Sequence, residues 1–310
     1  MRSLGISLLL AGIALAPGCA SDASEGDLVA AFYPLEFVTR RVVGDGHTVA
    51  NLTPAGAEPH DLELSARDTA SLRDARLVVH LGGFAPALDA AIAELPPDRV
   101  LDVTAAAQLE PHDGLADPHD DEHDEGSDAA GHTHAEGTAD PHFWLDPIRL
   151  GHVAEAVAEQ LAAADPGAAA GYRERAAALV AELTALDREF AAGLADCAVT
   201  SLVTSHTAFG YLAERYGLTQ IGVAGLSPDA EPAAGKLAEV IDFVNEHGVS
   251  TIYFETLVDP AVADTVAAET GAVTAVLDPL EGLPADAAGA DYFSVMRANL
   301  ATLRAGQRCS

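Results

Sequence analysis

The chain has 310 residues, of which 49% are hydrophobic, and it carries a formal net charge of −32. This length and apolar content allow one large hydrophobic core or two smaller ones and exclude wholesale disorder. So acidic a surface argues against a nucleic-acid partner and favours cations.

The N-terminus, MRSLGISLLLAGIALAPGCAS, has the pattern of a secretion signal. Arg2 precedes an apolar run over residues 4–16, which is too short for a bilayer span of about 20 residues. Small residues then lead to Cys19 in LAPGC, which is similar to a bacterial lipoprotein box. We predict a signal peptide over residues 1–18, acylation of Cys19 and a linker over residues 19–26. An ordinary signal peptide with a chance cysteine is the alternative.

The two remaining cysteines favour a disulfide. If Cys19 is acylated, Cys197 and Cys309 are left as a pair in an oxidising compartment. Their bond would close a loop of about 110 residues, which the chain-entropy model values at roughly 4–5 kcal/mol. Two buried free thiols are the alternative.

The first half alternates strand-like and helix-like runs. The strand-like runs are residues 28–32, 47–53 and 76–82, and the helix-like runs are residues 34–44 and 65–75. Ser65 is a typical N-cap for the second helix. Such alternation predicts a mostly parallel sheet with helices on both faces.

An acidic, histidine-rich segment at about residues 110–140 interrupts this rhythm. Gly, Asp and Pro recur throughout it without hydrophobic periodicity, so we expect a disordered loop. We expect weak, fast-exchanging metal capture there, with solubilising polarity as the alternative. The histidines concerned are His112, His119, His123, His132 and His134.

Order resumes with two helices. Asp146-Pro147 predicts one helix start and Asp165-Pro166 another. The second helix runs to Leu194 with apolar side chains at steps of three and four, and it would be about 43 Å long at 1.5 Å per residue. It is long enough to link two lobes, although a single core helix of one domain would show the same periodicity.

The last third repeats the α/β pattern. Strand-like runs lie at residues 200–205, 218–223, 249–255 and 272–278, and helix-like runs lie near residues 207–216, 231–247, 260–270 and 291–305. The predicted fold is therefore α/β, with two (β/α) lobes that each have a mostly parallel central sheet. The N-terminal lobe covers residues 27–165, the linking helix 166–194 and the C-terminal lobe 195–310.

Metal-capable side chains stand after several predicted strands. His60 and His142 come from the first half, and His206, Glu255 and Asp278 end strands of the second. Open α/β sheets bind ligands beyond the carboxyl ends of their strands, so two facing lobes would bring these residues into one cleft. Three imidazoles and one carboxylate suit Zn²⁺, whereas Mn²⁺ prefers more carboxylates.

The other histidines and the known enzyme motifs add little. Ordinary structural positions account for His47, His80, His152 and His247: strand start, strand interior, helix surface and helix C-terminus. The chain has no HExxH, GxSxG or P-loop motif, and no GxGxxG after a strand.

Six stretches together resemble the metal-binding lipoproteins of ABC importers for zinc and manganese, the ZnuA/TroA-type solute-binding proteins. They are AAFYPLEFVTRRVVGD, PAGAEPHDLELSARD, DPHFWLDP, VTSHTAFGYLAERYGL, IYFETLVDP and AVLDPLEG, and they cover nearly the whole mature chain. The resemblance implies two (β/α) lobes joined by a rigid helix, with the metal held between them.

The resemblance also implies the ligands. It places them at His60, His142 and His206, and because manganese members usually have Glu at the third position, it favours zinc. Asp278 matches the carboxylate that several members use as the fourth ligand, whereas other members use water or a nearby Glu, so Glu58 and Glu255 remain candidates beside the ligands. His80 stands where the resemblance implies an aromatic residue.

The function implied is an extracytoplasmic Zn²⁺ receptor, not an enzyme, that delivers metal to an ABC permease and its ATPase. We expect a monomer tethered to the bacterial cell membrane by its lipid. Binding should weaken as pH falls through the imidazole range near 6.5. The alternatives are a Mn²⁺ or Fe²⁺ receptor of the same family, a secreted zinc hydrolase and a passive metal buffer that depends on the loop alone.

Overall fold

The structure is a computed structural model that describes residues 27–112, 139–228, 232–257, 259–283 and 289–310. The predicted signal peptide, Cys19 and the linker lie outside the described residues. So does most of the histidine-rich loop, including His119, His123, His132 and His134. Among the described residues, no helix combines the length and apolar character that a membrane crossing requires.

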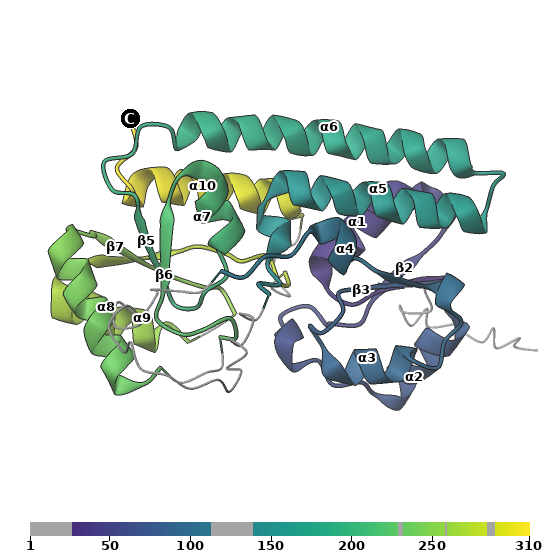
Figure 1. The fold of residues 1–310 in the computed structure, drawn as a ribbon, viewed down its shortest axis with the longest axis horizontal. Helices are drawn as coiled ribbons and strands as arrows, with labels where there is room; N and C mark the ends of the chain where they lie inside the picture. The colour runs from purple at the N-terminus through teal and green to yellow at the C-terminus, as the bar shows by residue number, and fades with distance from the viewer. Residues whose placement is uncertain (1–26, 113–138, 229–231, 258, 284–288) are drawn as a thin grey trace, which may run out of the picture.

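The first sheet has four parallel strands in the order β2-β1-β3-β4. These are β1 (Leu28–Ala30), β2 (Val49–Asn51), β3 (Leu77–His80) and β4 (Val100–Asp102). The two central strands are wholly buried, as expected for parallel strands covered on both faces. Helix α1 (Tyr33–Val43) lies on one side of the sheet, and α2 (Ala66–Asp74) and α3 (Pro86–Ile92) lie on the other (Figure 1).

The second sheet repeats this arrangement in the order β6-β5-β7-β8. Its strands are β5 (Ser201–Thr204), β6 (Thr219–Gly222), β7 (Thr251–Phe254) and β8 (Val273–Val276). Helices α7 (Gly210–Tyr216) and α10 (Tyr292–Gly306) lie on one side, and α8 (Ala234–His247) and α9 (Ala261–Thr270) lie on the other (Figure 1). The predicted α/β fold with two parallel sheets is confirmed.

Two long helices, α5 (Pro147–Ala164) and α6 (Ala169–Gly193), pack along each other, and α6 extends over both sheets (Figure 1). The N-terminal half of α6 contacts the first lobe, where Arg175 Nε donates to Val42 O at 2.7 Å. Its C-terminal half contacts the second lobe, where Glu189 pairs with Arg297 at 2.7 Å. The helix is therefore fastened at both ends.

The sequence located most elements to within a few residues, with two differences. Helix α6 begins at Ala169 rather than at Pro166, because Asp165 Oδ1 accepts the N–H of Gly167 and a turn precedes the helix. The sequence patterns also did not indicate α3, β4 and α4 (Thr104–Ala107), which are short. The described residues also form four 3₁₀ helices: η1 (Gly44–Gly46), η2 (Pro59–Asp61), η3 (Pro97–Arg99) and η4 (Phe143–Leu145).

Local signals and covalent bonds support this arrangement. Ser65 caps α2 in a capping box with Asp68, as its sequence position predicts. Cys197 and Cys309 form the predicted disulfide across a sequence separation of 112 residues. It fastens the C-terminus to the segment between α6 and β5.

Candidate metal centre

His60 follows β2 and lies in η2. The preceding Glu58 turns back, and its Oε1 accepts the backbone N–H of His60 at 3.1 Å. The imidazole packs on Phe84 with 4.5 Å between ring centroids. Its Nε2 is buried and has no hydrogen-bond partner among the described residues, so this nitrogen is available to a ligand.

His142 immediately precedes η4 and is wholly buried. Asp140 holds it twice, because Oδ1 accepts the backbone N–H of His142 at 2.9 Å and lies 2.7 Å from its Nδ1. A carboxylate at Nδ1 keeps the proton there and leaves Nε2 for a metal. Trp144 donates its Nε1–H to Pro279 O at 2.7 Å, which ties this turn to the second lobe.

Asp140 is the centre of a further network. Its Oδ2 lies 3.0 Å from His112 Nδ1, and the other nitrogen of His112 lies 3.2 Å from Glu214 Oε2. The hydroxyl of Tyr211 donates to Asp140 O at 2.9 Å. Burial raises the pKa of Asp140, but the hydrogen bonds from His112 and His142 outweigh it and lower the pKa. Of the predicted loop histidines, His112 is thus linked to His142 through one carboxylate.

His206 follows β5 and is buried. Its Nδ1 lies 2.5 Å from Glu255 Oε1, and Glu255 follows the neighbouring strand β7. Ser205 Oγ donates to the same carboxylate oxygen. The strand order therefore places the carboxylate that orients His206, and Nε2 of the ring remains for a metal.

Glu281 comes from the loop after β8 and is 1% exposed. The loop turns at Leu280, whose φ of 59° is in the left-handed region that a leucine rarely adopts. Asp278 Oδ1 accepts the N–H of Leu280 at 2.8 Å and stabilises this turn. The turn directs Glu281 towards the three histidines.

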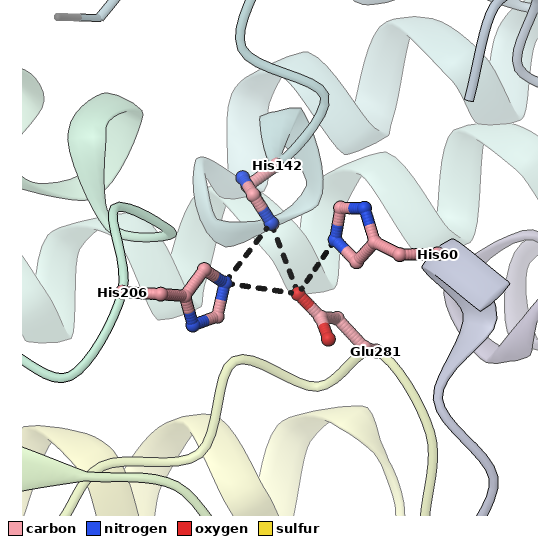
Figure 2. Close-up of side chains that lie close together, drawn as sticks. All are labelled: His60, His142, His206 and Glu281. Carbon is pink, nitrogen blue, oxygen red and sulfur yellow. Dashed lines mark hydrogen bonds and ion pairs between the residues drawn. The ribbon is translucent and has the colours of Figure 1, made fainter. Parts of the chain in front are cut away.

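Four side chains converge on one point between the lobes (Figure 2). Donor atoms of His60, His142, His206 and Glu281 all lie within 4.8 Å of one another. Glu281 Oε1 is 2.9 Å from His142 Nε2 and 3.4 Å from Nε2 of both other rings, and its distances to His142 and His60 join the two lobes. Ligands at about 2.0–2.1 Å from a tetrahedral Zn²⁺ stand about 3.3–3.4 Å apart, so this spacing fits zinc.

In the structure Glu281, rather than the expected Asp278, lies with the three histidines. Asp278 does not join the cluster, because its oxygens are used by Leu280 N and by Thr256 Oγ1 at 3.1 Å. Glu281, three residues later in the same AVLDPLEG stretch, takes that place. The rule that ligands follow strand ends pointed to Asp278, but β8 already ends at Val276. Glu58 and Glu255 stand beside His60 and His206 and outside the cluster.

The charges of the cluster are strongly coupled. Burial lowers the pKa of His206, but hydrogen bonds with Glu255 and Glu281 outweigh it and raise the pKa to about 10. The pKa of His142 is raised for the same reason, by Asp140 and Glu281 against burial. Burial raises the pKa of Glu281, but hydrogen bonds with the three imidazoles outweigh it and hold the pKa well below its usual range. Without metal, protons on imidazole therefore balance the buried carboxylate.

A hollow of about 290 Å³ reaches His60 from outside. Its walls include Phe84 of the first lobe and Leu226 and Ser227 of the second. The hollow therefore offers an approach to the cluster between the lobes.

The sequence model of one protein family, described as the periplasmic zinc-uptake complex component A, ZnuA, matches residues 28–306. The chain belongs to this family. Membership of a zinc-uptake family agrees with the convergence of four metal-capable side chains.

Similar proteins carry names that refer to zinc binding or zinc uptake. The zinc-binding protein AdcA of Streptococcus pyogenes serotype M3 is 38% identical over 288 residues, which cover 89% of this chain and 55% of that protein. The zinc-binding lipoprotein AdcA of Streptococcus pneumoniae serotype 4 is 37% identical over 310 residues, 96% of this chain and 60% of that protein. The high-affinity zinc uptake system protein ZnuA of Bacillus subtilis is 33% identical over 312 residues, 97% of this chain and 96% of that protein. The chain thus spans little more than half the length of its AdcA relatives.

Solved structures show the same fold. The laminin-binding protein Lmb of Streptococcus agalactiae superposes with a TM-score of 0.75 at 32% identity, covering 90% of this chain and 98% of that one. The Zn(II)-bound ZnuA-like domain of Streptococcus pneumoniae AdcA superposes with a TM-score of 0.71 at 34% identity, with the same coverage.

Proposed function

We propose that the protein is an extracytoplasmic receptor that captures Zn²⁺ between its lobes and delivers it to an ABC permease and its ATPase. The observation that carries this proposal is the convergence of His60, His142, His206 and Glu281. The first two come from the first lobe and the others from the second, so one ion would contact both. Zinc-uptake membership of the family and the zinc-binding names of its relatives support it.

The donor set favours zinc over harder cations. Three imidazoles and one carboxylate form a nitrogen-rich set, whereas Mn²⁺ is better served by more oxygen donors. His60 Nε2 has no hydrogen-bond partner among the described residues, and a bound ion would satisfy it. The Mn²⁺ or Fe²⁺ receptor is therefore the weaker alternative.

Binding rather than catalysis suits the same set. Catalytic zinc keeps an open position for water or substrate, whereas four protein ligands complete a tetrahedron. His142, His206 and Glu281 are at most 1% exposed, which leaves little access for a substrate molecule. The site therefore lacks the open metal position and the substrate access that a secreted hydrolase would need.

We also propose how the receptor is attached and assembled. Acylation of Cys19 would tether the receptor to the bacterial cell membrane, and an AdcA relative is named a lipoprotein. All four proposed ligands come from one chain, so a monomer suffices. Residues 27–165 and 195–310 would act as lobes, and the segment 166–194, fastened at both ends, would restrict them to modest closure.

Calorimetric titration of chelator-stripped protein tests the proposal. We expect one tight Zn²⁺ site, much weaker Mn²⁺ binding, and loss of the tight site in His60→Ala. His247→Ala is the matched control, because His247 bonds Phe243 O at the end of α8, away from the cluster. Tight binding that survives His60→Ala, or a preference for Mn²⁺, would contradict the zinc receptor.

A further inference from the structure

The first lobe contains a second cavity that the zinc-receptor function does not use. Its volume is about 470 Å³, and it lies at the carboxyl ends of β3 and β4. The residues that matter here are His80, Gly82, Gly83, Asp89 and Asp102. Gly82 and Gly83 also line the hollow beside His60, so this short loop separates the two spaces.

His80 is a buried histidine with an unsatisfied nitrogen. It is 6% exposed, and its Nδ1 makes no hydrogen bond among the described residues. One carboxylate oxygen, Asp89 Oδ1, is 3.4 Å from this nitrogen. A buried polar atom without a partner costs about 1–3 kcal/mol, so a ligand at this nitrogen would remove a real penalty.

Two carboxylates face the same cavity and are held by backbone groups. Asp102 pairs with His80 in the register of β4 on β3, so both side chains leave the same face of the sheet. Its Oδ1 accepts the N–H groups of Gly82 and Thr104, at 3.0 and 2.9 Å. Asp89 Oδ2 accepts the N–H of Gly83 at 2.9 Å. These hydrogen bonds fall on one oxygen of each carboxylate and leave the other for a cation.

Gly82 makes room for this arrangement. A Cβ at Gly82 would lie 2.6 Å from Asp102 Oδ2, which is closer than real Cβ contacts. A side chain at this position would displace the carboxylate. Glycine therefore keeps Oδ2 of Asp102 in place beside the loop.

The charges of the cavity suit a cation. Burial lowers the pKa of His80 and outweighs the charges of Asp102 and Asp89, so its ring is neutral near pH 7 and keeps a lone pair. Burial raises the pKa of Asp102, but hydrogen bonds from Thr104 and Gly82 outweigh it and lower the pKa. Arg99, close by in the sequence, donates instead to the carbonyls of Arg73 and Ala75.

We propose that this cavity is a second divalent-cation site, in which His80 Nδ1 and the carboxylates of Asp89 and Asp102 hold Zn²⁺ with water in the remaining positions. The donors are less assembled than in the main cluster, which is the one group among the described residues whose atoms all lie within 4.8 Å. Asp89 lines the cavity, its side chain is 33% exposed, and it would have to turn inward to complete the site. Because this ordering costs affinity, binding is weaker than at the main cluster. With two carboxylates, the site also discriminates less against Mn²⁺.

The test follows the backbone amides of Gly82 and Gly83 by NMR in the full chain. Chelator-stripped protein is first given one equivalent of Zn²⁺, and further ZnCl₂ is then added. We expect these two amides to show a separate shift after the first equivalent, with saturation in the micromolar range. His80→Gln and Asp89→Asn should each weaken this second event at least tenfold, and His247→Gln should not change it.

Each outcome has a clear meaning. If extra zinc binds while the two amides stay unmoved, the binding belongs to other histidines and the second site is absent. A shift that persists in His80→Gln also overturns the proposal. Each variant must still take up its first equivalent as wild type does, which shows that it is folded. A missing first event in wild type would instead contradict the zinc-receptor function.

A nearly isosteric variant gives an independent readout. If His80 only fills space, His80→Phe should remove an unsatisfied polar atom and leave zinc-dependent melting unchanged. If His80 is a ligand, zinc beyond the first equivalent should raise Tm in wild type and not in His80→Phe. An equal rise in both proteins refutes the second site.

Discussion

Carboxylates hold two imidazoles of the cluster at the nitrogen that faces away from the centre. Asp140 does so for His142, and Glu255 does so for His206. Such partners fix the tautomer and the ring orientation, and their loss typically costs about 10–100-fold in metal affinity. Glu281 differs from them because its oxygen lies among the Nε2 atoms. It therefore acts where a ligand would.

The choice between Glu281 and Asp278 is testable with two conservative variants. Glu281→Gln keeps the shape and removes the negative charge from the cluster, so zinc affinity should fall by more than the about 100-fold upper range for an outer partner. Asp278→Asn keeps an oxygen that accepts from Leu280 N, and its zinc affinity should fall less than about tenfold. Competition with a zinc chelator measures both. A larger loss in Asp278→Asn than in Glu281→Gln would return the fourth position to Asp278.

Close packing at the start of α7 shows how an element supports the cluster. Gly210 is the first residue of this helix, and a Cβ there would lie 2.6 Å from His112 Cβ and 2.7 Å from Asp140 Oδ2. Both atoms belong to side chains that bond each other, and Asp140 orients His142. The absence of a side chain at Gly210, the start of α7, thus allows Asp140 to hold the proposed ligand His142 in position.

We predict that Gly210→Ala lowers stability by about 1–3 kcal/mol through overpacking and also weakens zinc binding. The second effect follows because Asp140 must move. Gly235→Ala is the matched control: it lies in the first turn of α8, and an added Cβ meets nothing within 4 Å. It should raise stability by up to about 1 kcal/mol through helix propensity and leave zinc binding unchanged. Urea unfolding and zinc titration of both variants test this pair, and Gly210→Ala with unchanged affinity would contradict the role of Asp140.

The sequence predicted elements whose signals are local. Strand-like runs located β1, β3 and β5, and Ser65 as an N-cap located α2. It missed β4, which has three residues at the sheet edge and only partial burial, so no apolar run marks it. The sequence also predicted that His60, His142 and His206 lie together, because each lies beyond a strand or in a recognisable motif. Glu281 was not predicted as a ligand, because its position depends on the turn at Leu280, which no hydrophobic periodicity indicates.

Across the two lobes, which both contribute side chains to the cluster, metal binding is linked to the protonation of the histidines. The pKa of His206 near 10 means that this ring holds a proton in metal-free protein at pH 7, and the pKa of His142 is raised in the same direction. A raised folded-state pKa stabilises the protein fully below the unfolded value near 6.5 and loses this contribution as pH rises towards the folded value. The metal-free protein therefore loses this stabilisation between about pH 6.5 and 10.

Zinc requires neutral imidazoles, so its binding must release these protons. We predict release of at least one proton per Zn²⁺ at pH 7, because the pKa of His206 is near 10 and that of His142 is raised as well. We also predict that zinc affinity, and with it the rise in Tm caused by zinc, increases from pH 6 to pH 9 rather than levelling above the ordinary imidazole range. Calorimetry in buffers of different ionisation enthalpy measures the proton count, and Glu255→Gln should lower it because His206 then loses one of the two carboxylates that raise its pKa. Affinity that is flat above pH 7, with no proton released, would show that the metal-free rings are already neutral and that Glu281 alone holds the negative charge of the cluster.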